Sequence, residues 1–225
     1  MPTLQRINTT AIVTLTALLA LSACKSEIDD KPAAKTEEAA KIDDKGDKGE
    51  AADKGDAPAG EAKTLPLTVN GSSVGFIGAK VTADHKGSFE KFEGNATLEG
   101  DKLTGLEITV EMKSMTTDAE KLTGHLLSPD FFDAENHPQA KFTSVSITEK
   151  AADGATHEVA GNLELRGKAN KVTFPATIEV GSGEVVGKAA FSINRKEWGI
   201  DYAGMADDLI KDDVALELEL HFPRG

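Results

Sequence analysis

The sequence contains few of the residues from which catalytic and metal-binding sites are usually built. Its single cysteine, Cys24, excludes an internal disulfide and a multi-cysteine metal site. Its five histidines show no ligand spacing such as HExxH, so we predict no catalytic residues, no metal and no cofactor. A formal net charge of −13 also argues against binding a nucleic-acid backbone as the main task.

Aromatic residues are sparse as well, at 5% of the chain with one Trp and one Tyr. The aliphatic residues are sufficient for one hydrophobic core. A length of 225 residues fits either one domain with appendages or two small domains. The composition therefore indicates an apolar core that is mainly aliphatic, without the residues of a typical enzyme site.

The first 23 residues have the pattern of an exported protein. An uncharged, mostly apolar run from Ala11 to Ala23 is too short to cross a hydrocarbon core of ~30 Å as a helix, but it suits a signal peptide. The run ends in LSAC, which resembles a bacterial lipobox. We predict a lipoprotein signal peptide over residues 1–23 and acylation of the Cys24 thiol. The alternative is an ordinary cleaved signal peptide followed by an incidental cysteine.

The residue after Cys24 predicts which membrane holds the anchored protein. Lys25 stands where an aspartate would retain a lipoprotein at the inner membrane, so we expect an anchor in the outer membrane of a bacterial envelope. More than one acyl chain makes such an anchor stable.

Residues 24–63 are predicted to form a disordered, charged linker after the acylated cysteine. Charged residues, Ala and Gly dominate this segment, and Ile28 and Ile42 are its only branched apolar side chains. Such a segment buries too little surface to offset the entropy of ordering.

A period-two pattern of apolar residues predicts strands over residues 64–225. The clearest alternation lies at 214–222, 172–180 and 108–112, and weaker strands are expected at 74–77, 88–98, 142–147, 159–165 and 189–193. Only Thr117 to Leu127 is typical of a helix, with a second short turn at Asp207 to Ile210. About eight strands predict an all-β antiparallel barrel or sandwich, in which Pro175 should lie at an edge or a bulge.

The stretch from Gly124 to Phe142, GHLLSPDFFDAENHPQAKF, has the most distinctive order of residues in the chain. Its two prolines rule out one long helix or one central strand. We predict an ordered connection that carries Leu126, Leu127, Phe131 and Phe132 as an apolar plug.

Four motifs within residues 65–223 resemble the YceI-like family of bacterial exported proteins. They occur in the family's order and cover nearly all of the predicted folded part. The motifs are HKGSFEKFEGNATL (His85 to Leu98), LTGHLLSPDFFDAENHPQAKFTS (Leu122 to Ser144), VAGNLELRGKANKVTFPA (Val159 to Ala176) and INRKEWGIDYAGMADDLIKDDVAL (Ile193 to Leu216).

This resemblance implies a lipocalin-like antiparallel barrel that holds a long polyisoprenoid chain in an apolar channel. Many relatives carry an arginine–aspartate pair before the His-Leu motif, where this chain has Leu122-Thr123-Gly124. The apolar channel therefore carries over, and the polar contacts to a ligand headgroup do not.

The residues that we expect to line or close such a channel are aromatic. An isoprenoid or quinone tail offers no hydrogen-bonding groups, so a dry apolar tube is what binding requires. Phe131 and Phe132 are the strongest candidates, because they lie outside the strands and can close the mouth. The full set is Phe76, Phe89, Phe92, Phe131, Phe132, Phe142, Phe174, Phe191 and Trp198.

Three functions remain open at this point. The first is a lipid-anchored protein that binds an isoprenoid or a similar apolar chain in the cell envelope. The second is an interaction module whose barrel is filled by its own side chains. The third is a metal-assisted enzyme that uses His125 and His137 with Asp133.

Overall fold

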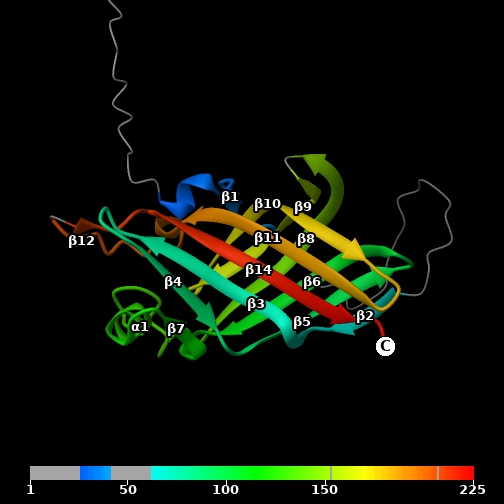
Figure 1. Cartoon of the computed structure of the whole chain (residues 1–225), viewed down its shortest axis with the longest axis horizontal. Helices are drawn as coiled ribbons and strands as arrows, with labels where there is room; N and C mark the ends of the chain where they lie inside the picture. Colours follow the sequence, from blue (N-terminus) through cyan, green and yellow to red (C-terminus); the bar gives the residue numbers. More distant parts are fainter. Residues whose placement is uncertain (1–25, 42–61, 153, 207) are drawn as a thin grey trace, which may run out of the picture.

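Most of the residues that the structure describes form one strongly curled antiparallel sheet (Figure 1). The computed structural model describes residues 26–41, 62–152, 154–206 and 208–225, so the predicted signal peptide and Cys24 lie outside the described residues. Within those ranges, twelve strands join the sheet in the order β2-β5-β6-β8-β9-β10-β11-β14-β3-β4-β7, with β1 paired to β10. The strands are β1 (Lys35–Glu38), β2 (Ala62–Pro66), β3 (Thr68–Ala79), β4 (Asp84–Phe89), β5 (Phe92–Glu99), β6 (Lys102–Glu111), β7 (Met115–Thr117), β8 (Gln139–Ala152), β9 (Ala155–Leu165), β10 (Lys168–Val180), β11 (Glu184–Asn194) and β14 (Asp213–Pro223).

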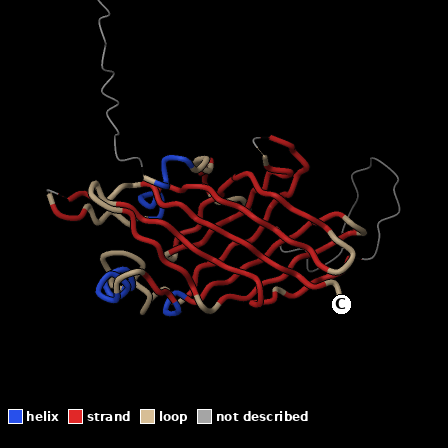
Figure 2. The backbone as a smooth tube through the Cα atoms, viewed as in Figure 1, coloured by secondary structure: helices blue, strands red, loops and turns tan. Residues whose placement is uncertain are grey.

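The sheet curls into a half-barrel whose apolar side chains face inward. Its helical segments lie at one end of the strand body (Figure 2). They are α1 (Glu120–Leu127) and the short 3-10 helices η1 (Glu27–Asp30), η2 (Met112–Ser114) and η3 (Arg195–Trp198). Among the described residues, no helix is long and apolar enough to cross a membrane. The all-β class is thus confirmed.

The predicted count of about eight strands is wrong. Each of the eight predicted stretches overlaps an observed strand, but bends divide the sheet further. Leu67 separates β2 from β3, and residues 90–91 separate β4 from β5. Each half then has its own partner, since β2 pairs with β5 whereas β3 pairs with β4 and β14. Alternation of apolar residues predicts the face of a strand, but it does not show where a long strand bends.

The helical predictions are only partly right. The helix expected from Thr117 begins at Glu120, because Thr117 belongs to β7 and pairs with Gly87 of β4. The turn of helix expected at 207–210 is wrong for the described residues. Strands β12 (Gly204–Met205) and β13 (Asp208–Leu209) form a small hairpin there.

Pro175 lies at a gap along one side of β10. On that side β10 pairs with β1 as far as Thr173 and with β11 only from Thr177. Proline lacks the N–H that a continuous ladder would require, so this gap accommodates it. Pro175 thus lies at a locally unpaired edge of β10, in agreement with the prediction of an edge or a bulge.

Residues 26–41 occupy the place where β10 and β11 separate, and we call them the strap. β1 pairs with β10, while Ala34 N donates to Ser192 O of β11 over 2.8 Å. The Asn162 side chain in β9 exchanges two hydrogen bonds with the backbone of Ala40. The strap thereby satisfies backbone groups on strand edges that would otherwise be open.

The predicted disorder of residues 24–63 is therefore wrong for 26–41. Ile28 is 3% exposed and packs with Ile77, Ala79 and Ala215. Ion pairs add to this contact: Lys31 lies 2.6 Å from Glu217, and Lys211 lies 2.8 Å from Asp29. Backbone pairing orders this segment although it has few apolar side chains.

Candidate ligand-binding cavity

An apolar cavity of about 230 Å³ lies inside the half-barrel. The inward residues of β14 line it along their whole length, from Val214 to Phe222. Eight residues of strand span roughly 26 Å, so the cavity is long and narrow. Further lining comes from alternate residues of β3, β6, β10 and β11.

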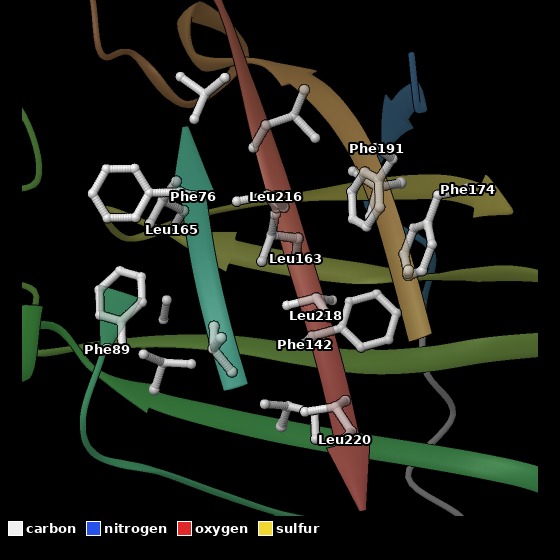
Figure 3. A pocket seen from close by; sticks show the side chains of 18 of the residues that line it. Phe76, Phe89, Phe142, Leu163, Leu165, Phe174, Phe191, Leu216, Leu218 and Leu220 are labelled. Carbon is white, nitrogen blue, oxygen red and sulfur yellow. The ribbon is translucent and has the colours of Figure 1, made fainter. Parts of the chain in front are cut away.

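Aromatic and leucine side chains from both sides of the half-barrel point into one common space (Figure 3). The Phe174 and Phe191 rings stack with centroids 4.0 Å apart, and Phe142 tilts against Phe174 at 5.7 Å. Phe76 and Phe89 form a second tilted pair at 5.7 Å. Close-packed strands bring these rings together from residues far apart in the sequence.

Two glycines make room for these rings. A Cβ on Gly87 would lie 2.3 Å from the Phe76 ring, and one on Gly161 would lie 2.4 Å from the Phe142 ring. Real Cβ atoms do not approach that closely, so each glycine lets an aromatic ring lie flat on the neighbouring strand.

The structure separates the nine residues predicted to bind a ligand into two groups. Two of them do not line the cavity: Phe92 packs at the edge of the main core, and Trp198 is buried there with its indole N–H donating to Leu163 O at 3.0 Å. Their position favours a structural role. The residues that do line the cavity are Phe76, Phe89, Phe131, Phe132, Phe142, Phe174 and Phe191. Whether these side chains bind a ligand stays a prediction.

The stretch from Gly124 to Phe142 covers one end of the cavity. Leu126, Leu127 and Phe132 pack against the cluster formed by Phe76, Met112, Met115 and Ala134. Phe131 is 5% exposed and contacts both His125 and Tyr202, with ring centroids at 5.0 and 5.1 Å. This connection is therefore built into the core and also lines the cavity.

Few polar side chains reach the cavity. Lys141 and Lys188 are exposed residues. The buried Arg195 guanidinium donates to the carbonyl oxygens of Ile200, Ile210 and Lys211 and lies 3.5 Å from Asp212. Burial lowers the pKa of Arg195, and the carboxylate of Asp212 opposes this shift. Arg195 thus fastens η3 to the segment before β14.

Lys80 and His85 are further polar residues that line the cavity, and His85 lies on β4. It lines the cavity with a side chain that remains 30% exposed, which places it at the cavity's rim. Its Nδ1 lies 3.1 Å from each carboxylate oxygen of Asp118.

A metal site is not formed in the part of the chain that the structure describes. No group of three or more His, Cys, Asp or Glu residues is placed to hold an ion there. Of the two histidines that we considered as ligands, His125 and His137, the first lies 3.1 Å from Asp130 and packs against two aromatic rings.

Much of the cavity lining is aliphatic and was not among the residues predicted to bind a ligand. The alternation of β14 predicts its strand, and the same alternation identifies the inward face that forms the cavity wall. The residues not singled out include the aliphatic Leu163, Leu165, Val214, Leu216, Leu218 and Leu220, together with Phe222.

Comparison with known proteins assigns the chain to a family. A model of the YceI-like domain matches residues 66–222. The chain belongs to the YceI-like family. A UPF0312 protein of Pseudomonas putida strain W619 is 31% identical over 139 residues, which are 58% of this chain and 71% of that protein. A UPF0312 protein of Pectobacterium carotovorum is 33% identical over 100 residues, 44% of this chain and 50% of that protein.

Two solved structures share the fold of this YceI-like chain. BcnA of Burkholderia cenocepacia matches with a TM-score of 0.58 and 24% identity over 67% of this chain and 95% of its own. A polyisoprenoid binding domain from Saccharophagus degradans, implicated in plant cell wall breakdown, matches with a TM-score of 0.57 and 13% identity, over 72% of this chain and 99% of its own. At 24% and 13% identity, the likeness to these two structures establishes the fold alone.

Proposed function

We propose that this protein binds a long apolar chain, such as a polyisoprenoid or the isoprenoid tail of a quinone, in the bacterial cell envelope. The observation that carries the proposal is the narrow cavity, about 230 Å³ in volume, lined along β14 by apolar side chains. The Saccharophagus degradans domain with the same fold is described as polyisoprenoid binding, which supports this ligand class.

The shape of the cavity favours a slender ligand. Its volume lies just below the ~300–1,000 Å³ typical of small-molecule pockets, whereas its lining follows roughly 26 Å of strand. A linear hydrocarbon fits such a space better than a compact ring system. Burial of its surface contributes about 25 cal/mol per Å², with few specific polar contacts required.

We further propose that Cys24 carries acyl chains that anchor the protein in a membrane, with the outer membrane as the expected one. Ser26, two residues after Cys24, is the first described residue and contacts the start of β4. The same strand carries His85 at the cavity's rim. An anchor at Cys24 is therefore close in sequence to a contact beside the rim, which favours ligand exchange with the membrane surface.

The test is lipid extraction and native mass spectrometry of the full chain purified from bacterial cells, followed by uptake of a polyprenol and of a quinone. The Gly187→Phe variant should have a blocked cavity. Gly187 lines the cavity and faces open space, since a Cβ there would have no heavy atom within 4 Å, so a phenylalanine ring can occupy that space. Gly183→Phe is the matched control in the exposed turn before β11.

We expect the unaltered chain and the Gly183→Phe variant to retain or take up the apolar ligand, and Gly187→Phe to lose it. An unaltered chain that is free of ligand and takes up neither compound would overturn the proposal.

A further inference from the structure

The rim of the cavity at His85 combines apolar walls with two polar side chains, those of His85 and Lys80. His85, Gly87 and Phe89 lie on the same face of β4, since alternate residues of a strand point to the same side. Phe89 lines the cavity and a Cβ on Gly87 would meet the Phe76 ring, so this face is the inner one. His85 therefore presents its ring toward the cavity.

One ring nitrogen of His85 is occupied and the other is open. The Asp118 carboxylate can only accept, so the proton between them belongs to Nδ1 of His85. Among the described residues, Nε2 of His85 has no hydrogen-bond partner. The ring is thus held in one orientation by Asp118 while Nε2 remains able to bind a ligand atom.

Open space lies on the strand next to His85. Gly78 of β3 is the cross-strand partner of His85, and a Cβ on Gly78 would have no heavy atom within 4 Å. Gly78 also lines the cavity, as do Leu122 of α1 and Ile210 close by in the fold. The absent side chain leaves room beside the imidazole for a small headgroup.

We propose that His85 is a specificity-determining residue whose Nε2 binds the terminal hydroxyl of a long apolar chain. This inference rests on the proposed function and assigns the ligand class as a chain alcohol. With its proton on Nδ1, neutral His85 accepts at Nε2, and protonated His85 donates there. A hydroxyl group satisfies either form because it both donates and accepts, whereas a quinone carbonyl only accepts.

The carboxylate beside His85 disfavours an anionic headgroup at its ring. Asp118 faces Nδ1, whereas Asp84 precedes His85 in β4 and therefore points to the opposite face, where it accepts from Ser26 Oγ and Glu27 N. The Asp118 carboxylate would repel a phosphate bound at Nε2, and farnesyl phosphate tests this repulsion against attraction by Lys80, which also lines the cavity. A neutral headgroup avoids this repulsion.

The experiment measures the dissociation constants of farnesol, farnesene and farnesyl phosphate with the full chain, its His85→Leu variant and a His221→Gln control. These ligands share the isoprenoid tail and differ in the headgroup. His221 follows Leu220 in β14, so its side chain lies on the outer face, away from the cavity.

We expect the unaltered chain to bind farnesol about two- to tenfold more tightly than farnesene, which is the contribution of one neutral hydrogen bond. His85→Leu should remove that preference by weakening farnesol binding, with farnesene unchanged. His221→Gln should behave as the unaltered chain. A second measurement uses the unaltered chain alone, so it does not depend on whether a variant folds. In it, farnesol should shift the ¹⁵N resonance of His85 Nε2 and farnesene should not.

Three results would overturn this inference. Equal binding of farnesol and farnesene, with no shift at Nε2, removes the headgroup contact while the proposed function stands. Tighter binding of farnesyl phosphate than of farnesol replaces the alcohol by an anion. Failure of the unaltered chain to bind any of the three compounds removes the proposed function and this inference together.

Discussion

Ser26 Oγ donates a hydrogen bond to Asp84 Oδ1 over 2.7 Å, which joins the start of the strap to the first residue of β4. Asp84 also accepts from Glu27 N at 2.8 Å, so one carboxylate holds the first turn of η1. The residue after Asp84 is His85, at the rim of the cavity. The segment that follows the predicted acylation site is thus fastened directly beside the cavity.

Replacing Ile28 should release the strap. Ile28→Ser removes the side chain that packs with Ile77 and Ala79, and the loss of such a buried group costs about 2 kcal/mol or more. We expect faster amide hydrogen exchange at Ala34 and Ser192, whose backbone groups bond across the strap. Hydrogen exchange with mass spectrometry or NMR measures this.

The matched control is Val69→Ser, because Val69 is 57% exposed in β3. It should leave exchange in the strap unchanged. If Ile28→Ser also leaves the Ala34 and Ser192 amides protected, backbone pairing alone holds the strap and the apolar contact is dispensable.

Replacing Cys24 tests the anchor. Cys24→Ser keeps the size of the side chain but removes the thiol that takes the acyl group, so we expect the protein to lose its lipid mass and leave the membrane fraction. Mass spectrometry of the purified chain and fractionation of the cells measure both effects. Retention of Cys24→Ser in the outer-membrane fraction would point to a different mode of attachment.

The two adjacent phenylalanines at the end of the cavity should respond differently to truncation. Phe131 is 5% exposed, so Phe131→Ala should cost about 3–5 kcal/mol of unfolding free energy. Phe132 is only partly buried, so Phe132→Ala should cost less and should mainly weaken retention of an apolar ligand. Chemical denaturation and ligand uptake, measured on both single variants, separate the two effects.

This contrast refines the idea that the pair closes the cavity as a lid. The sequence predicts both rings equally, whereas the packing makes Phe131 a core residue. If Phe132→Ala unfolds the protein as readily as Phe131→Ala does, Phe132 is core as well and the lid interpretation is wrong.

The sequence predicts the strands well because their apolar residues alternate. Val214 to Phe222 in β14 shows this most clearly, and the same residues line the cavity. The bend at Leu67 and the ordering of the strap are different. They depend on backbone pairing between distant segments, such as Lys35 with Thr173, for which the local sequence carries no signal.

The sequence predicts the apolar character of the candidate site, but it predicts only some of the residues that line the cavity. Phenylalanine is large and apolar wherever it packs, so the sequence alone does not separate the cavity wall at Phe174 from the core at Phe92. The contact between His85 and Asp118 joins residues 33 positions apart, and it follows from the pairing of β4 with β7.

The stability of β14 should depend on pH through His221. Hydrogen bonding to Glu184, over 3.1 Å, raises the pKa of His221 above its ordinary value, with a smaller contribution from Glu219. A raised pKa in the folded state stabilises the protein fully below the unfolded value of about 6.5, and this contribution is lost as the pH rises through the folded pKa. The His221→Gln variant lacks this stabilising contribution at every pH.

We therefore expect the difference in Tm between the unaltered chain and His221→Gln to shrink as the pH rises from about 5.5, where the carboxylates are still ionised. His157→Gln is the matched control, since the His157 ring bonds to the Thr156 hydroxyl instead of to a carboxylate. Parallel Tm profiles for the unaltered chain and His221→Gln would show that the contacts with Glu184 and Glu219 do not stabilise the fold.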